Sequence, residues 1–359
     1  MSTTRPGTMA SVRDLDLLPK AHLHLHFTGS MSVPTLLEVA ALEGVELPES
    51  LTDDIALDVP FDQRGWFRFQ RLYDTARHAV RSEASLRLVV RRAAEDDARE
   101  GSRRLELQVD PTGYAAGVGG VQPALEIVLD AAREASEATG VQVGVIVAAS
   151  RLKHPMDARA LARLAARFAG DGPGRVIGFG LSNNERHGST AEWEGAFRIA
   201  RAAGLRSVPH GGELLGPDAV RVTLDALRPD RIGHGVRAAE NPALVHEIAQ
   251  RGVPLEVCPM SNVHLGVFRH PASVPLRTLT DAGVQVALGA DDPLLFLSRL
   301  TDQYRLAREA HGFTDAELAG LAKASIAASF ATHADKRAWA AEVDEWLART
   351  DSPAAAPDR

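Results

Sequence analysis

The sequence contains a single cysteine, Cys258, among its 359 residues. An intrachain disulfide is therefore excluded, and the composition favours a reducing, cytoplasmic setting over a secreted one. Excess positive charge is also lacking, because 40 Lys and Arg residues stand against 47 Asp and Glu residues, for a formal net charge of −7. Without a basic tract, we do not expect a nucleic acid as a partner.

Long hydrophobic runs are missing as well. The sequence has no continuous apolar segment of about 18 residues, so we expect no membrane-spanning helix and no membrane partner. The start of the chain, MSTTRPGTMASVRDLD, has no apolar run, so we expect no signal peptide. Both ends are small and polar, which predicts disordered segments at residues 1–14 and 350–359 around a single domain at residues 15–349.

A repeated pattern of helix, glycine and short apolar run fills the rest of the chain. It is clearest around Gly204, Gly252 and Gly283, where glycine suits the left-handed position after a helix. Counting the apolar runs gives eight candidate strands, at residues 21–27, 103–110, 141–149, 175–182, 206–213, 231–236, 253–260 and 284–290. Eight strand–helix units predict an α/β fold, a (β/α)₈ TIM barrel. An open doubly wound sheet is the alternative, but no GxGxxG turn follows the first strand.

The long interval between the first two strands, residues 28–102, predicts a helical insertion over the active-site face of the barrel. Its aromatic residues Trp66, Phe67 and Phe69 would either line or cover a pocket there, or simply pack the insertion against the barrel. Two helix starts fit the capping box, at residues 189–192 and 314–317.

Three histidines alternate with apolar residues in KAHLHLHFTGS, at residues 20–30. Positions two apart share a face of a strand, so His22, His24 and His26 point the same way. Catalytic residues of barrels lie at the C-terminal ends of strands, which favours His24 and His26 as metal ligands. His22 would lie one layer deeper, as a hydrogen-bonded core histidine.

Further histidines and carboxylates fall at three other predicted strand ends, at His210 and Glu213, at His234, and at Asp291 and Asp292. Three imidazoles and one carboxylate would suit zinc, and also iron, manganese or cobalt. A hydrolytic site also needs an acid and a base, for which Glu213 and His234 are the spare groups.

At these residues the chain resembles the adenosine deaminase family, through PKAHLHLHFTGS, HGGE, RIGHGV, EVCPMSN and GADDP in that order. The resemblance implies one Zn²⁺ per subunit, bound by His24, His26, His210 and Asp291. It implies that Glu213 protonates purine N1, that His234 orients or deprotonates the attacking water, and that Asp292 binds N7. The implied reaction replaces the 6-amino group of a purine nucleoside with oxygen and releases ammonia.

Two departures from the family pattern concern the substrate. Thr28 stands where the family usually has an acidic residue that contacts the ribose 5′-hydroxyl, and Asn183 stands where a glycine contacts purine N3 through its backbone. Both are candidate substrate contacts. Thr28 favours a 5′-modified adenosine, such as aminodeoxyfutalosine of menaquinone biosynthesis, over plain adenosine or adenine.

Two alternative functions are also compatible with the sequence. A related amidohydrolase acting on another amide or amidine, and a catalytically silent relative, are the alternative functions. Ser261, Asn262 and His264 follow the seventh strand as candidate pocket residues, and Cys258 is expected to be a buried thiol. The sequence leaves the oligomeric state open.

Overall fold

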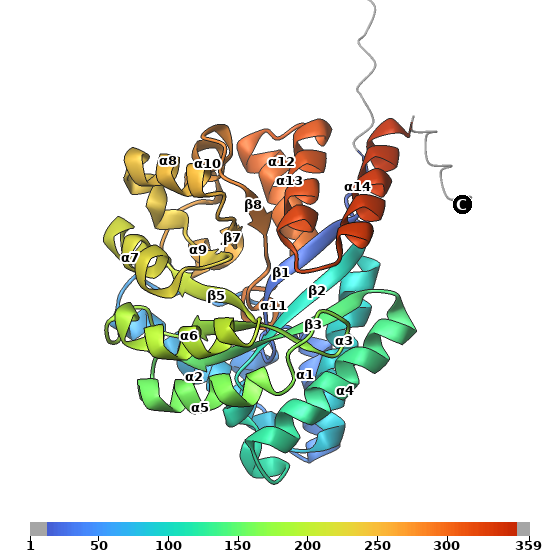
Figure 1. Cartoon of the computed structure of the whole chain (residues 1–359). Helices are drawn as coiled ribbons and strands as arrows, with labels where there is room; N and C mark the ends of the chain where they lie inside the picture. Colours follow the sequence, from blue (N-terminus) through green and yellow to red (C-terminus); the bar gives the residue numbers. More distant parts are fainter. Residues whose placement is uncertain (1–12, 350–359) are drawn as a thin grey trace, which may run out of the picture.

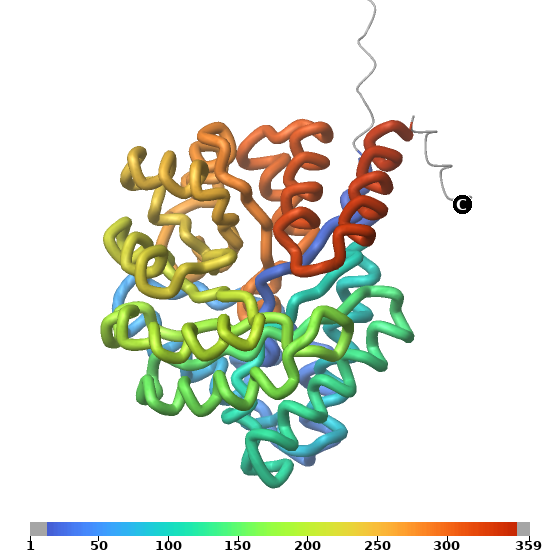
Figure 2. The backbone as a smooth tube through the Cα atoms, in the orientation of Figure 1, coloured from blue at the N-terminus to red at the C-terminus, as the bar shows by residue number. Residues whose placement is uncertain are grey.

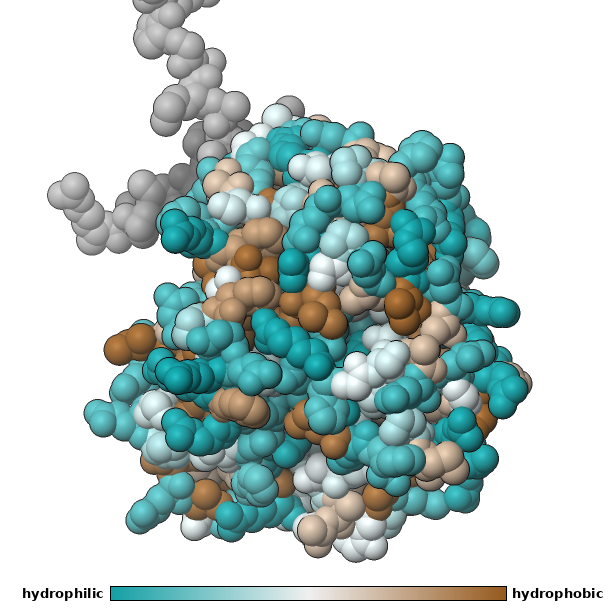
Figure 3. All heavy atoms as spheres, turned by 90° about the vertical axis from the view of Figure 1, so that its left-hand side faces the viewer, coloured by the Kyte–Doolittle hydropathy of each residue, from teal (hydrophilic) through white to brown (hydrophobic). Residues whose placement is uncertain are grey.

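The computed structural model describes residues 13–349. The predicted disordered segments, 1–14 and 350–359, lie outside the described residues except for residues 13 and 14. Among residues 13–349, no helix is both long enough and apolar enough to cross a bilayer. On the face shown in Figure 3, apolar side chains are scattered among hydrophilic ones.

Eight parallel strands form one sheet in sequence order, as the alternating pattern predicts (Figure 1). They are β1 Lys20–His26, β2 Ser102–Val109, β3 Gln142–Ser150, β4 Val176–Ser182, β5 Arg206–Gly211, β6 Ile232–His234, β7 Leu255–Val257 and β8 Val286–Leu288. The last three strands are shorter than predicted. In β6 the cause is visible, because His234 and Gly235 have positive φ angles of 62° and 69°, which end the extended backbone.

The barrel closes where β8 meets β1. The amide of Asp291 donates to the carbonyl of His24 over 3.1 Å, and the amide of His26 donates to the carbonyl of Asp291 over 3.0 Å. A parallel bridge pairs Leu25 with Asp291. The predicted (β/α)₈ barrel is therefore confirmed, with a narrow junction between its first and last strands.

Helices surround the barrel and connect its strands (Figures 1 and 2). They are α1 Val33–Glu43, α2 Gln63–Ala79, α3 Glu83–Arg99, α4 Val121–Thr139, α5 Pro155–Ala166, α6 Glu194–Ala202, α7 Pro217–Val222, α8 Pro242–Arg251, α9 Pro259–His264, α10 Leu276–Asp281, α11 Pro293–Phe296, α12 Leu300–His311, α13 Asp315–Ala328 and α14 His333–Ala348. Helices α1 to α3 form the predicted insertion after β1.

One predicted capping box is confirmed and the other is wrong. Thr314 and Glu317 cap α13 reciprocally, side chain to backbone in both directions. Ser189 instead precedes a 3₁₀ turn, Thr190–Trp193, and its side chain makes no capping hydrogen bond. The α-helix begins only at Glu194, so the sequence pattern falls one turn ahead of the helix it was expected to cap.

The interior of the barrel is partly ionic. Arg231 lies 2.6 Å from Glu106 and 2.5 Å from Glu256, and Glu106 is also 3.0 Å from Arg104, with all four side chains fully buried. Such a network adds little net stability over an apolar core, but removing one partner costs about 3–5 kcal/mol. These charges lie beneath the strand ends that carry the candidate site.

Candidate active site

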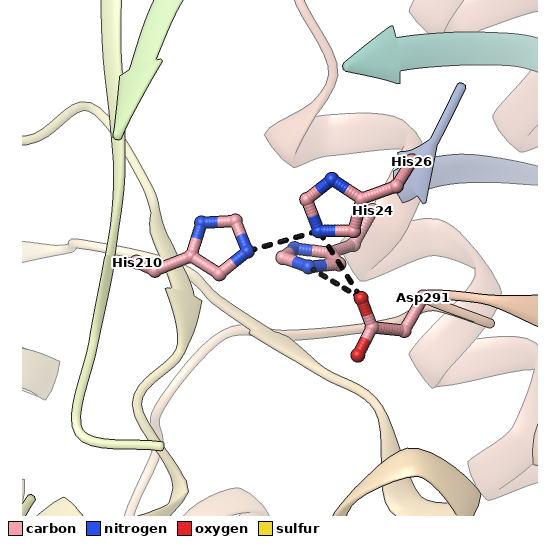
Figure 4. A group of neighbouring side chains, drawn as sticks. All are labelled: His24, His26, His210 and Asp291. Atoms are coloured by element: carbon pink, nitrogen blue, oxygen red, sulfur yellow. Dashed lines mark hydrogen bonds and ion pairs between the residues drawn. The ribbon is translucent and has the colours of Figure 1, made fainter. Parts of the chain in front are cut away.

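Side chains from the ends of two strands, β1 and β5, and from the chain after β8 converge at the mouth of the barrel (Figure 4). The Oδ1 atom of Asp291 lies 3.4 Å from Nε2 of His24 and 3.2 Å from Nε2 of His26. Nε2 of His26 lies 3.1 Å from Nε2 of His210. The four predicted ligands therefore surround one common point, although His24 and Asp291 are 267 positions apart in sequence (291 − 24).

Their unpaired atoms fit a divalent metal. One ligand atom from each of His24, His26, His210 and Asp291 lies within 4.8 Å of all the others. Nε2 of His24 and Nδ1 of His210 are buried without a hydrogen-bond partner. Buried polar atoms of this kind are normally satisfied, and an ion at the centre of the cluster would satisfy the free His24 nitrogen.

A second grouping, of His24, His234, Cys258 and Asp291, also meets the distance condition. It shares His24 and Asp291 with the first, so it describes a displaced position of one ion. Burial raises the pKa of the Cys258 thiol, and its sulfur donates to the carbonyl of Glu256 over 3.7 Å. A protonated thiol is a poor ligand, so the first grouping is favoured, and Cys258 is the buried thiol that was predicted.

The charge states differ among His24, His210 and Asp291. Burial lowers the pKa of His210 well below its usual range, which keeps the imidazole neutral, as a ligand must be. Burial alone would raise the pKa of Asp291, but the neighbouring imidazoles of His24 and His26 hold it well below its usual range. Burial would lower the pKa of His24, yet the neighbouring carboxylates of Asp291 and Glu256 raise it to about 10, so metal binding would displace a proton there.

Glu256 was not predicted from the sequence, although it lies within the EVCPMSN segment. Its Oε2 accepts a hydrogen bond from Nδ1 of His24 over 2.7 Å, which leaves Nε2 of that ring facing the cluster. Arg231 holds the other oxygen of Glu256. A carboxylate behind a ligating histidine fixes its orientation and raises its basicity.

The candidate acid and base lie on the same side of the cluster. Nε2 of His234 is 3.7 Å from Oε1 of Glu213 and 3.9 Å from Oδ2 of Asp291. Burial, reinforced by the charges of Asp291 and Glu185, raises the pKa of Glu213 well above its usual range. Burial lowers the pKa of His234 to about 3, so one group keeps its proton near neutrality while the other is free to accept one.

Glu185 is the second residue that sequence reasoning missed. Its carboxylate, 2% exposed, accepts hydrogen bonds from four consecutive backbone amides of residues 212–215, over 2.6 to 3.0 Å. Gly212, at φ 73°, turns the chain there, and a side chain would collide with Val220. Glu185 therefore fixes the loop that carries Glu213.

Ser261, Asn262 and His264, which follow β7, contact other residues near the site. Ser261 donates to Oδ2 of Asp291 over 2.6 Å, and Nδ2 of Asn262 lies 3.5 Å from Nδ1 of His234. His264 stacks on Phe296. None of the three lines the cavity, so of the two roles open to them, pocket lining and loop packing, the structure supports packing. The helix α9 that begins at Pro259 turns them toward site residues or neighbouring rings instead.

A cavity of about 750 Å³, including its open mouth, lies over the cluster. Its lining includes His26, His210, Glu213, His234, Asp291 and Asp292. Asn183, the candidate substrate contact, lines it as well. Burial and the neighbouring charge of Asp291 raise the pKa of Asp292 well above its usual range.

Thr28 is fully buried and does not line the cavity. Its hydroxyl lies 2.6 Å from that of Tyr114, which does line it. Trp66 and Phe69 of the insertion also line the cavity, whereas Phe67 is 63% exposed and points away from it. Of the two alternatives left open for these aromatic residues, the pocket-lining one holds for Trp66 and Phe69 but not for Phe67, because helical spacing puts Phe67 on another face of α2.

Known proteins resemble this chain in both sequence and fold. The adenosine deaminase family model matches residues 19–346. A Streptomyces coelicolor protein, provisionally named adenosine/adenine deaminase, is 58% identical and covers 94% of this chain and 99% of its own. The crystal structure of an Arthrobacter aurescens adenine deaminase matches with a TM-score of 0.83 and 29% identity, over 92% of this chain and 99% of its own. An amidohydrolase from Burkholderia ambifaria with bound Zn matches at 0.81 and 25% identity, over 93% and 92%.

Proposed function

The chain belongs to the adenosine deaminase family, and from that premise we propose that it is a zinc-dependent hydrolase that removes the 6-amino group of an aminopurine as ammonia. The observation that carries the proposal is that four ligand atoms converge beside a cavity that the buried carboxyl of Glu213 also lines. We propose His24, His26, His210 and Asp291 as the ligands. A zinc ion bound there would supply Lewis-acid chemistry, which makes water a nucleophile at neutral pH.

The other residues divide the proton transfers between them. Glu213 keeps its proton because burial raises its pKa, so it can donate to ring nitrogen N1 and make C6 more electrophilic. His234 is neutral and adjacent, so it can accept the proton that water loses on attacking C6. Asp292 would hold N7, and Asn183 would contact the other edge of the ring. The proton on His234 would then pass to the amino group, which leaves as ammonia, while the C6 hydroxyl gives its proton to Glu213 and becomes the 6-oxo group.

The substrate within this class is a finer proposal. Thr28 has no carboxylate, and its hydroxyl is hydrogen-bonded to that of Tyr114. This position therefore offers no acidic partner to a 5′-hydroxyl. Such a site suits a 5′-modified adenosine. Aminodeoxyfutalosine, an intermediate of menaquinone biosynthesis, is the candidate of this kind that the sequence favours. It suits adenine equally, and the adenine deaminase named among the structural neighbours favours that second candidate.

A substrate panel tests both levels of the proposal. Ammonia release is measured with adenine, adenosine, methylthioadenosine and aminodeoxyfutalosine on zinc-loaded protein, with His24→Ala as the metal-deficient control. We expect turnover of at least one of these compounds, and loss of both zinc and activity in His24→Ala. Failure with all of them would sink the deaminase proposal, whereas a kcat/KM highest for plain adenosine would sink only the inference from Thr28.

The partner and location follow from the same proposal. The cavity suits a small purine, and the net charge of −7 gives no reason to expect a nucleic acid. The single cysteine supports a cytoplasmic setting.

A further inference from the structure

The third histidine of β1, His22, is not among the grouped metal ligands. Its side chain is fully buried, with Nδ1 lying 3.0 and 3.2 Å from the two carboxylate oxygens of Asp97 in α3. On the other side of the ring, Nε2 accepts a hydrogen bond from the backbone amide of Ala290 over 3.1 Å. His22 therefore connects the helical insertion to the residue that precedes Asp291.

These contacts fix the tautomer of the ring. A backbone N–H can only donate, so Nε2 of His22 must present a lone pair to Ala290. The ring proton is then on Nδ1, where the Asp97 carboxylate accepts it. Asp97 thus ensures that the acceptor nitrogen of His22 faces Ala290.

The backbone at Asp291 needs such support. Asp291 has a φ of 64°, in the left-handed region that costs a non-glycine residue about 1 kcal/mol or more. Strained conformations persist only where the surrounding structure over-determines them. Here the amide and carbonyl of Asp291 both bond to β1, and His22 holds the preceding amide.

We propose that His22 is a positioning residue for the metal centre, which holds the left-handed turn that aims the Asp291 carboxylate at the ion, and that Asp97 acts through His22 by fixing its tautomer. The inference rests on the proposed metal site. An apolar side chain at position 22 could fill the space but would leave the Ala290 amide buried and unpaired. The histidine therefore contributes a hydrogen-bond acceptor as well as packing volume.

The test is zinc affinity, measured by competition with a chromophoric chelator on full-length protein. His22→Phe keeps a ring but removes the acceptor, and we expect it to weaken zinc binding about tenfold or more, as the loss of a supporting hydrogen bond usually does. The matched control His22→Gln can place an amide oxygen near Ala290 and should stay within about threefold of wild type. Because the effect passes through Asp291, the same His22→Phe change in an Asp291→Asn background should alter zinc affinity less than about twofold.

Asp97 provides a second route if His22→Phe does not fold. Asp97→Asn keeps an acceptor for the ring proton, whereas Asp97→Leu does not, so only the leucine variant should weaken zinc binding. Equal zinc affinity in wild type, His22→Phe and Asp97→Leu would overturn the inference while leaving the metal site intact. An undiminished His22→Phe effect in the Asp291→Asn background would also overturn it. A wild-type protein that binds no zinc would overturn the proposed metal centre together with this inference.

Discussion

Nδ1 of His24 lies 2.7 Å from Oε2 of Glu256, and both side chains are fully buried. The same carboxylate is 2.5 Å from Arg231, so the proposed ligand is linked to the ionic network inside the barrel. A ligand held in this way cannot rotate to expose its other nitrogen without breaking a buried charged hydrogen bond. The geometry of the centre therefore depends on residues that lie outside the cavity.

We expect Glu256→Gln to weaken zinc binding about 10- to 100-fold, because the orienting acceptor of His24 loses its charge. The matched control is Glu106→Gln, which disturbs Arg231 from its other side without touching His24. Both variants should lower the free energy of unfolding, by about 3 kcal/mol. Chelator competition and denaturant unfolding separate the two effects, and equal zinc loss in both variants would contradict the assignment to His24.

We expect Glu213→Gln to retain zinc and to lose about 10²- to 10⁴-fold in kcat, because an amide cannot transfer the proton that the buried carboxyl holds. Metal content and steady-state ammonia release measure the two quantities on the same sample. Glu194→Gln, on an exposed position of α6, is the control for handling and folding. Zinc-replete Glu213→Gln with wild-type turnover would remove Glu213 from the mechanism.

We expect Glu185→Gln to free the loop at residues 212–215, because a side-chain amide offers one acceptor oxygen and places donors against backbone donors. Hydrogen exchange of those amides should accelerate, and kcat should fall by about tenfold or more because Glu213 is misplaced. Zinc affinity should stay close to wild type, since Glu185 contacts no proposed ligand side chain. Slow exchange of these amides in the variant would show that the loop keeps its conformation without the Glu185 carboxylate.

We expect Glu317 to contribute to the free energy of unfolding in a way that is lost in acid. Hydrogen bonds from Arg277 and then from Thr314 lower its pKa from 4.5 to about 2. Because the folded-state pKa lies below the unfolded value, the contribution is fully present above pH 4.5 and is lost as the pH falls toward 2. The Tm of Glu317→Gln should therefore lie below that of wild type at pH 6, and the difference should shrink at pH 3. A difference that is independent of pH would show that the ion pair contributes nothing.

Periodicity and motif spacing along the chain were enough to predict the barrel and most of the candidate site. Strand and helix periodicity and the glycines after helices are local signals, because they depend on residues a few positions apart. The placing of functional residues at strand ends follows from the parallel topology, so His24, His26, His210 and one aspartate could be grouped from the sequence. The resemblance to the adenosine deaminase family then singled out Asp291. The capping box at Thr314 could be predicted because it, too, depends on residues only three positions apart.

The buried groups that support those residues could be identified only from the folded barrel. Glu256 meets His24 across 232 positions of sequence, and Asp97 meets His22 across 75. No local pattern marks such a pair, because the hydrogen bond exists only after the barrel closes and removes both groups from water. The same closure engages the Thr28 hydroxyl with Tyr114 and turns Ser261 toward Asp291, since burial forces each polar group to find the partner that the fold brings nearest.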